Sequence, residues 1–495
     1  MASDNPQSDT AQSVDSPASD STDTQQTPEQ TKAKAAPKRP HVVVLGGGMG
    51  GLSAVKTLKR ADVDVTLIDR HIYSTFQPLL YQVATATLNP GDITYFLRAT
   101  RAKQKNVRFL AGTVRSIDHN QKLIHLKENV SVEYDYLIIA CGVTANFFGV
   151  PGAAEYSIPL YKRKQALEIR NQLFAKFEDY VVNGQDRDLR VVMVGGGPTG
   201  VEVAGALAEM RNYDMPVTYP MLDTKRIHVT IVEMGDHLLS PFEPKLRDYT
   251  LAQLEKRDVD VRLNTAVKEV YENGVTIEKD GKESFLESEL VVWSSGITVH
   301  PTVKDWGVPQ GKGGRIVIDD HCRVPGVPDV FAAGDIATNP DSPLPQLGQP
   351  AIQEGRYAAK YIKRKVKGKP EPKPFKYFDK GTMATIGRNA AIAQVNHLPS
   401  LRGFIAWAMW AAVHVAFLVT NQNRFSTMVN LSNKYLFRRN RNAIVGDTPY
   451  GYSQQAVIIG SENVVTPVDQ AGDHRDDDGN EIPAEYHQQQ PPNSD

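Results

Sequence analysis

Two glycine-rich segments of the chain have the residue types and the spacing that bind phosphate groups. Residues 46–51 read GGGMGG and residues 195–200 read GGGPTG, so both match the pattern G-x-G-x-x-G. The glycines that define the pattern are Gly46, Gly48 and Gly51 in the first segment, and Gly195, Gly197 and Gly200 in the second. In such a loop, backbone N–H groups and the start of a helix hold a pyrophosphate. Two loops in one chain predict two bound dinucleotides, which indicates electron transfer between them.

An acidic residue follows each loop at the position expected for ribose binding. Asp69 ends the run 63–69, and Glu233 ends the run 228–233. A carboxylate at the end of the second strand accepts hydrogen bonds from adenosine ribose hydroxyls. Ordinary strand-end acids are the alternative, but the complete loops upstream favour ribose binding. Glu233 would also repel a 2′-phosphate, so we expect NADH rather than NADPH as the electron donor.

The elements that must position these residues predict a fold of class α/β. Apolar runs at 41–45 and 190–194 lead directly into the two loops, and helical patterns follow them. This order of strand, loop, helix and strand is typical of Rossmann-like dinucleotide-binding domains. We therefore expect two such domains, followed by a C-terminal membrane-associating helical region.

Three further strand patterns end in glycine. The segments that end at Gly142 and Gly296 resemble the strands that lead the chain out of each dinucleotide domain. The segment 330–335 ends in Gly334 and Asp335. We expect the Asp335 carboxylate to lie near the pyrophosphate and the neighbouring sugar chain of the dinucleotide on the first loop. A plain turn aspartate is the alternative.

The order of these patterns predicts that the second domain is inserted in the first. The expected parts are a disordered tail at 1–40, a first dinucleotide domain at 41–157 and 297–375, a second at 158–296, a C-terminal membrane-attachment region at 376–446, and a disordered tail at 447–495. The tails are rich in Ser, Asp, Gln, Thr and Pro, which cannot bury enough apolar surface to offset the entropy of ordering.

The composition excludes several classes of protein. The formal net charge of the 495 residues is -1, which gives no electrostatic case for nucleic acid binding. The two cysteines, Cys141 and Cys322, argue against a disulfide scaffold and against a cysteine-rich metal site, and we expect no metal. We interpret both as small buried residues, with Cys141 in a buried strand.

Four segments make the chain resemble a known family. They are 76–84 (FQPLLYQVA), 195–202 (GGGPTGVE), 349–353 (QPAIQ) and 379–384 (DKGTMA). With the two loops, they are similar to the type II (non-proton-pumping) NADH:quinone oxidoreductases of the two-dinucleotide-domain flavoproteins, over residues 41–446. The resemblance implies FAD on the first loop, NADH on the second, and a respiratory membrane quinone as electron acceptor.

The resemblance also assigns candidate site residues. Gln77 lies in the segment expected to contact the flavin, although Ile72 and Ser74 replace the Asn and His that the family often has just before it. Gln349 and Gln353 are one helical turn apart and would hydrogen-bond a quinone carbonyl.

Two charged residues complete the candidate catalytic set. Glu202 resembles the family's site carboxylate, and Lys380 resembles a lysine near it. The alternatives are an acid favoured by the helix dipole and a solvated turn lysine.

Residues 403–419 form the most apolar stretch of the chain, and a mixed stretch follows at 425–437. The basic residues Arg438, Arg439 and Arg441 come directly after them. This pattern favours helices that lie in the membrane interface, with cations at the headgroups, over a spanning helix. A buried core or dimer helix is the alternative. We expect peripheral attachment through residues 400–441 at the cytoplasmic face of the cell membrane. The sequence does not decide whether the acceptor is menaquinone or ubiquinone, or whether the protein forms a homodimer.

Three rival functions share the two loops. A sulfide:quinone oxidoreductase would need a reactive cysteine pair at the flavin. A soluble FAD-dependent NAD(P)H reductase would lack the region 403–441. A flavin-bound signalling protein of the apoptosis-inducing-factor type would keep both loops but turn over poorly.

Overall fold

A computed structural model describes residues 39–183, 187–396, 398–437, 457–459 and 465–467. The expected tails lie almost wholly outside the described residues, and so does the basic cluster Arg438, Arg439 and Arg441. Within the C-terminal tail, only the backbone of two short antiparallel strands is described, β26 (Val457–Ile459) and β27 (Val465–Pro467).

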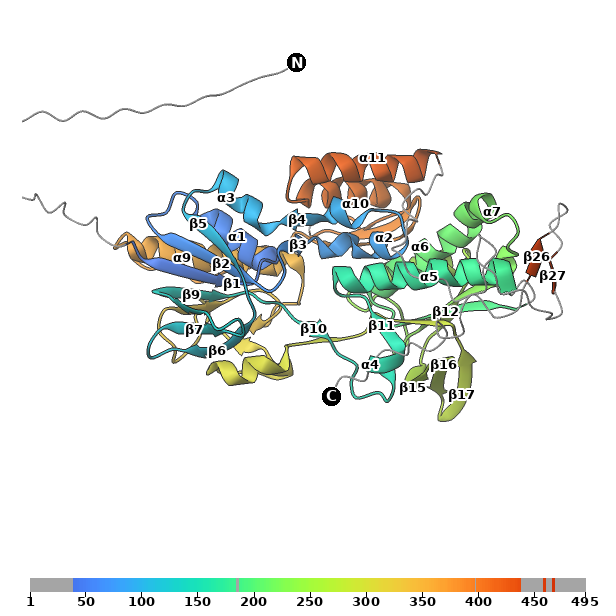
Figure 1. Cartoon of the computed structure of the whole chain (residues 1–495), viewed down its shortest axis with the longest axis horizontal. Coiled ribbons are helices and arrows are strands. Elements are labelled where there is room, and N and C mark those ends of the chain that lie inside the picture. Colours follow the sequence, from blue (N-terminus) through green and yellow to red (C-terminus); the bar gives the residue numbers. More distant parts are fainter. Residues whose placement is uncertain (1–38, 184–186, 397, 438–456, 460–464, 468–495) are drawn as a thin grey trace, which may run out of the picture. The chain divides into compact units, whose positions relative to one another are not determined.

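A five-stranded parallel sheet contains the first glycine loop (Figure 1). Its order is β21 (Val330–Ala332), β9 (Tyr136–Ile139), β1 (His41–Leu45), β2 (Asp64–Asp69) and β5 (Val107–Ala111). The central strand β1 is almost wholly buried, which explains its continuous apolar run. The loop leaves the carboxyl end of β1 and opens helix α1 (Met49–Leu58).

A second five-stranded parallel sheet contains the second loop. Its order is β11 (Ser157–Pro159), β18 (Leu290–Trp293), β12 (Leu189–Val194), β13 (Ile227–Val232) and β14 (Val259–Arg262). The strands that precede the glycine loops, β1 and β12, are central in their sheets. The strands β9 and β18, which precede Gly142 and Gly296, lie beside them. The two sheets therefore repeat one topology, and the predicted α/β class with two Rossmann-like units is confirmed.

Each parallel sheet carries a three-stranded antiparallel sheet before its exit strand. The first consists of β6 (Val114–Asp118), β7 (Leu123–Leu126) and β8 (Ser131–Glu133), and the second of β15 (Ala266–Tyr271), β16 (Gly274–Lys279) and β17 (Lys282–Glu287). Two crossing segments connect the halves and pair antiparallel, β10 (Thr144–Ala145) and β19 (Ile297–Thr298).

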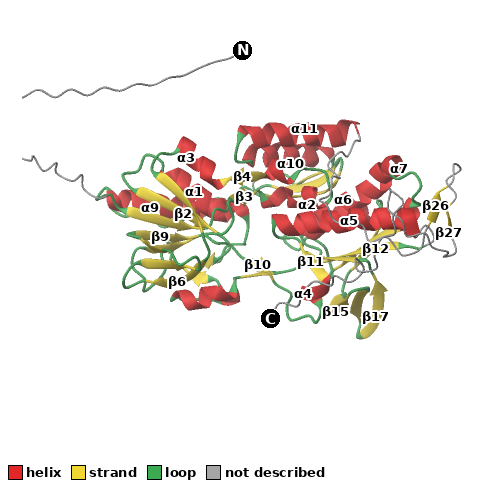
Figure 2. Ribbon diagram, viewed as in Figure 1, coloured by secondary structure: helices red, strands yellow, loops and turns green. Residues whose placement is uncertain are grey.

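Helices cover both sheets, as Figure 2 shows. They include α2 (Leu80–Ala84), α3 (Thr100–Lys103), α4 (Ala153–Tyr156), α5 (Arg163–Asn183), α6 (Pro198–Glu209), α7 (Met215–Thr218), α8 (Pro244–Glu255) and α9 (Gly348–Val366). Helices α1 and α9 pack backbone to backbone, because a Cβ on Gly355 would lie 2.2 Å from the Gly50 carbonyl oxygen. Two further short pairs are β3 (Tyr73–Thr75) with β4 (Thr94–Phe96), and β20 (Ile316–Val317) with β22 (Ala337–Thr338).

The C-terminal region forms a sheet and two helices. The sheet consists of β23 (Thr382–Gly387), β24 (Ala390–Gln394) and β25 (Leu401–Arg402), and the helices are α10 (Phe404–Phe417) and α11 (Asn421–Phe437). Trp410 of α10 is fully buried in the core that contains α2, α5 and α6. Among the residues that the structure describes, no helix combines the length and the apolar character needed to cross a membrane.

Candidate functional site

The first glycine loop has a geometry that requires glycine at two of its positions. Gly46 has a φ of +97°, and a Cβ there would lie 2.3 Å from the Ala140 carbonyl oxygen. A Cβ on Gly51 would lie 1.8 Å from the Gly46 carbonyl oxygen. A Cβ on Gly48 would meet nothing within 4 Å, so this residue faces open space. No side chain caps the N-terminus of α1, which leaves its backbone N–H groups available to an anion.

Asp69 supports this loop as well as facing the adjacent cavity. Its Oδ2 accepts a hydrogen bond of 2.6 Å from the Gly47 N–H, and its Oδ1 accepts one of 2.7 Å from the His71 N–H. The remaining lone pairs of a carboxylate can still accept ribose hydroxyls.

The second loop repeats the first in detail. Gly195 has a φ of +108°, and a Cβ on Gly200 would lie 1.9 Å from the Gly195 carbonyl oxygen. Gly197 again faces open space. Glu233 occupies the place of Asp69, and its Oε2 accepts a hydrogen bond of 2.6 Å from the Gly196 N–H.

A cavity of about 430 Å³ adjoins the first loop. Its lining includes the loop glycines 46–48, Asp69, Gln77, Gly142, Tyr161, Gly334 and Asp335. Gln77 donates a hydrogen bond of 3.3 Å to the Tyr161 carbonyl, and the Tyr161 hydroxyl donates one of 3.4 Å to Asp335. The structure therefore brings together, on one cavity, residues from all the segments that the sequence assigned to the first dinucleotide. Uncapped backbone amides at the start of α1 and the carboxylates of Asp69 and Asp335 therefore adjoin the same cavity.

Burial shapes the chemistry of Asp335. Desolvation raises the pKa of its carboxyl above the ordinary value, while the Tyr161 hydroxyl and the Arg315 guanidinium oppose the shift. Gly334 beside it has a φ of +81°, a backbone conformation that favours glycine.

Gly296 lies apart from this cavity. Its φ is +75°, and a Cβ there would lie 2.2 Å from the Phe148 ring. This glycine precedes β19 and allows the chain to pass close to Phe148 as it leaves the second sheet.

The interpretation of Cys141 as a buried residue is wrong. Cys141 is exposed, because it follows the end of β9 and lines the cavity beside Gly142. Cys322 is fully buried, as expected. The two thiols lie in different surroundings, and neither forms a disulfide.

Glu202 lies in α6, the helix that follows the second loop. The residue is half-buried, and desolvation of its carboxyl raises the pKa to about 8. The Thr385 N–H of β23 donates a hydrogen bond of 3.5 Å to its Oε1, which favours the charged form and opposes the shift. The Trp410 indole approaches the same carboxyl and also lowers its pKa, although its N–H meets no acceptor in hydrogen-bond geometry among the described residues. Burial therefore favours the protonated form of the Glu202 carboxyl, which lies against Thr385 and Trp410 of the C-terminal region.

The side chain of Gln353 is already occupied. Its amide donates a hydrogen bond of 2.9 Å to the Phe378 carbonyl and accepts one of 3.0 Å from the Phe378 N–H. Gln349 lies half-buried in the first turn of the same helix, α9. Lys380 is exposed, and its Nζ lies 5.5 Å from the centre of the Phe417 ring at the end of α10. The segment 378–380 is thus held between α9 and α10.

One buried acid near the cavity escaped the sequence reasoning. The Oε2 of Glu354 in α9 accepts a hydrogen bond of 2.6 Å from the Gly334 N–H, and burial raises its pKa to about 7. Glu354 directly follows the segment 349–353, and its position next to Gln353 was the signal available in the sequence. Its orientation toward the turn before Asp335 was not predictable.

Comparisons with known proteins agree with this arrangement. A family model described as pyridine nucleotide-disulphide oxidoreductase matches residues 40–355, and a model described as NDH2 C-terminal domain matches residues 380–440. The type II NADH:quinone oxidoreductase NdhA of Mycobacterium tuberculosis is 39% identical over 406 residues, which cover 79% of this chain and 86% of that protein. The enzyme Ndh of the same organism is 34% identical over 435 residues, 85% of this chain and 93% of its own length.

A solved structure shows the same fold. The structure of NDH2 from Plasmodium falciparum in complex with NADH matches with a TM-score of 0.75 at 22% identity, over 81% of this chain and 100% of that chain. The fold repeats one glycine loop twice, has a cavity on the first loop, and ends in a C-terminal region that matches the family model. This chain belongs to the family of type II NADH:quinone oxidoreductases, FAD-containing enzymes that transfer electrons from NADH to a quinone.

Proposed function

We propose that this chain performs the family's reaction at a membrane surface, with the nucleotides on the two loops and the quinone beside α6, α9 and α10. NADH is the donor and a quinone the acceptor, as family membership establishes. The observation that carries the spatial proposal is the position of Glu202. It lies on the helix opened by the second loop, and the C-terminal region encloses its carboxyl.

FAD would lie in the cavity on the first loop and, when bound, would carry the electrons from NADH to the quinone. The uncapped backbone N–H groups at the start of α1, beginning at Gly48, would bind its pyrophosphate. Asp69 would accept the adenosine ribose hydroxyls. Gln77 and Asp335, which both contact Tyr161, would orient the part of the cofactor between the pyrophosphate and the flavin ring.

NADH would lie on the second loop. Gly197 leaves space for its pyrophosphate, and α6 has no side-chain cap or acidic first turn to compete with it. Glu233 would accept the hydroxyls of the adenosine ribose. Its negative charge would exclude a ribose that carries a 2′-phosphate.

Glu202 would hold the proton that quinone reduction requires. Its raised pKa keeps the carboxyl protonated at neutral pH, which suits a general acid. Because the Gln353 amide pairs with the Phe378 backbone, we propose that Gln353 positions the segment 378–380 and through it Lys380. Gln349 makes no such pairing within the described part of the chain, and it would bind the quinone carbonyl.

The helices α10 and α11 would attach the protein peripherally to the membrane. Both expose large apolar side chains to solvent, namely Phe404, Ile405, Phe417, Phe425, Met428, Val429 and Leu436. Exposed apolar surface of this extent on neighbouring helices supports an interfacial role. We propose the cytoplasmic face of the cell membrane, which would bring a menaquinone or ubiquinone to Glu202. A homodimer stays a prediction.

Stopped-flow spectroscopy of the detergent-solubilised holoenzyme tests the proposed site. Replacing Glu202 by Gln keeps the size of the side chain and removes its proton. We expect reoxidation of the flavin by quinone to slow by about 100-fold or more, the usual range for a general acid, while flavin reduction by NADH is unchanged. The variant Glu255→Gln, on the exposed face of α8, is the matched control. Equal slowing of both half-reactions would place Glu202 outside the quinone side.

A further inference from the structure

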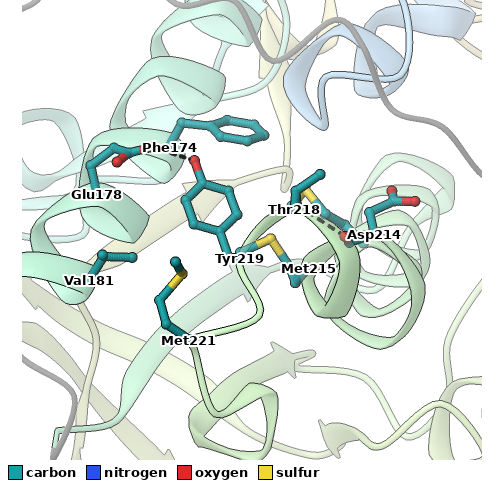
Figure 3. A pocket seen from close by; sticks show the side chains of 9 residues that line it. Phe174, Glu178, Val181, Asp214, Met215, Thr218, Tyr219 and Met221 are labelled. Atoms are coloured by element: carbon teal, nitrogen blue, oxygen red, sulfur yellow. Dashed lines mark hydrogen bonds between the residues drawn. The ribbon is translucent and has the colours of Figure 1, made fainter. Parts of the chain in front are cut away.

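A second cavity lies away from both glycine loops, between α5 and the segment 210–221. Its volume is about 370 Å³, and Figure 3 shows the side chains that line it. They are Phe174, Glu178, Val181, Met210, Asp214, Met215, Thr218, Tyr219 and Met221. None of them lines the dinucleotide cavity, so this pocket is a separate feature of the molecule.

An irregular helix builds one wall of this cavity. After α6, residues Met210–Asp214 form a single turn of π-helix, and α7 follows directly. Such turns are rare and are frequently found at functional sites. Met210 and Met215 are buried, whereas Met221 is exposed at 44% of its surface. Three flexible thioethers give the cavity an apolar wall that can adapt to ligands of different shape.

The polar groups of the cavity are acidic. The Tyr219 hydroxyl donates a hydrogen bond of 2.5 Å to Glu178, as the dashed line in Figure 3 marks. The charge of Asp214 is compensated from outside the cavity, since its Oδ2 lies 3.6 Å from Lys434 Nζ of α11. Among the described residues that line the cavity, none is a lysine, an arginine or a histidine. Glu178 contributes a carboxylate to the cavity that the aromatic rings of Phe174 and Tyr219 also line.

This combination selects one class of ligand. A carboxylate repels anions, and a neutral apolar molecule would leave its charge partly desolvated without compensation. An ammonium group donates a charge-assisted hydrogen bond to the carboxylate and is attracted to the aromatic faces. Cavities of this size, apolar with few polar groups, are typical of small-molecule sites.

We propose that this cavity binds an amphiphilic organic amine, with its ammonium at Glu178 and its apolar body against the methionines. The site is distinct from the NADH and quinone sites, and it requires neither of them. The ligand is defined by its chemistry: one positive charge on an aromatic or branched apolar group that fills about 370 Å³ or less.

Titration calorimetry of the FAD-loaded enzyme with three matched probes tests this site. The probes are 1-naphthylmethylamine, the neutral 1-naphthylmethanol and the anionic 1-naphthoate. We expect one amine to bind per chain, about tenfold more tightly than the alcohol, because one charge-assisted hydrogen bond is worth at least that factor. The naphthoate should not bind. Equal binding of amine and alcohol would show an apolar pocket without charge recognition and overturn the proposal.

Two variants and a control locate the binding. Glu178→Gln should weaken amine binding about tenfold and leave alcohol binding unchanged. Met221→Arg places a cation at the exposed edge of the cavity and should abolish amine binding without disturbing the core. Glu168→Gln changes an exposed acid on the same helix, outside the cavity, and should have no effect. Amine binding that persists in both Glu178→Gln and Met221→Arg would place the site elsewhere.

Discussion

Single residues show how closely the two halves of the chain repeat each other. Asp69 and Glu233 each accept a hydrogen bond of 2.6 Å from the second glycine of their own loop. These acids therefore support the loops in addition to the proposed contact with ribose. Removing the whole side chain would disturb both roles, so a variant that keeps an acceptor oxygen is the informative one.

The choice between NADH and NADPH is predicted to depend on the charge of Glu233. In Glu233→Gln, the amide oxygen can still accept from Gly196, while the repulsion of a 2′-phosphate is lost. We expect the ratio of kcat/KM for NADH over NADPH to fall about tenfold, in line with the loss of one close like-charge contact. Asp236→Asn, an exposed acid three residues away, is the control and should leave the ratio unchanged. An unchanged ratio in Glu233→Gln would contradict the assignment.

The pH dependence of quinone reduction is predicted from Glu202. Its pKa is raised to about 8 by burial, so the proton it would donate is present below pH 8 and lost above it. The rate of flavin reoxidation by quinone should be constant between pH 6 and about pH 7.5 and then fall toward a tenfold decrease per pH unit. Glu202→Gln should be slow and show no such fall. A rate that rises through pH 8 would indicate that Glu202 acts as a base.

The free energy of unfolding should depend on pH because Glu354 is buried. Its pKa of about 7 in the folded chain exceeds the ordinary 4.5, so the folded state binds the proton more tightly than the unfolded state. This contribution to stability is complete below pH 4.5 and is lost as the pH rises through 7, in total about 3 kcal/mol. Glu354→Gln retains an acceptor for the Gly334 N–H and lacks the titration. The difference in Tm between variant and parent should therefore move in favour of the variant from pH 5 to pH 8; a constant difference would argue against it.

At the scale of elements, α11 is held by polar side chains rather than by apolar packing alone. Asn423 is 8% exposed, and its Nδ2 donates to the carbonyls of Gly91, Asp92 and Thr94 at 3.0, 2.9 and 3.0 Å. The Asp92 carboxylate in turn accepts from Asn430 at 2.7 Å and from the Ser426 hydroxyl. This cluster fixes α11 to the segment that follows α2.

Replacing Asn423 by Ala should destabilise the protein. The buried carbonyl of Asp92 and the more accessible carbonyls of Gly91 and Thr94 would lose their donor. The cost is about 1–3 kcal/mol for a buried group left unpaired and less where water replaces the donor. We expect Tm, followed by circular dichroism of the holoenzyme, to fall by several degrees. Gln422→Ala, one residue earlier and exposed, should leave Tm unchanged. If both variants melt like the parent, α11 does not depend on this cluster.

The parallel strands and the glycine loops were predictable because their signals are local. The run 41–45 coincides with β1, and the expected strand at 190–194 differs from β12 by one residue. The pairing of Gln353 with Phe378 and of Asn423 with Gly91 was not predictable, since each joins residues far apart in the sequence. Cys141 was misjudged for a related reason. A strand pattern gives the end of a strand only approximately. Here Ala140 is still buried, whereas the next residue, Cys141, is exposed at the cavity.

At the scale of the whole molecule, membrane attachment should depend on the apolar side chains that α10 and α11 expose. Each large side chain removed from water contributes about 25 cal/mol per Å² of apolar surface. Deletion of both helices would also remove Trp410 and Tyr435 from the core, so substitution is the cleaner experiment.

The combined variant Phe404→Ser, Ile405→Ser, Phe425→Ser and Leu436→Ser should move the protein from the floating vesicle fraction to the bottom fractions in flotation assays with anionic vesicles. Its activity with long-tailed quinones should fall more than that with short soluble ones. The parent should resist high salt, which does not screen the apolar contribution. Phe285→Ser, an exposed residue of β17, is the control. A folded, FAD-loaded variant that still floats with the vesicles would place the attachment elsewhere.

The insertion of one sheet within the other has a consequence for synthesis on the ribosome. All strands of the second sheet lie between residues 157 and 293, so that sheet is complete in the nascent chain while the first still lacks β21. Because domains fold as units when their sequence has emerged, the half that carries the second glycine loop is expected to fold first. Until residues 330–332 leave the tunnel, β9 remains an unpaired edge beside a finished neighbour. The cavity on the first loop is lined by Asp335 and Ala351, so the proposed FAD site is completed only after the sheet of the second loop has formed.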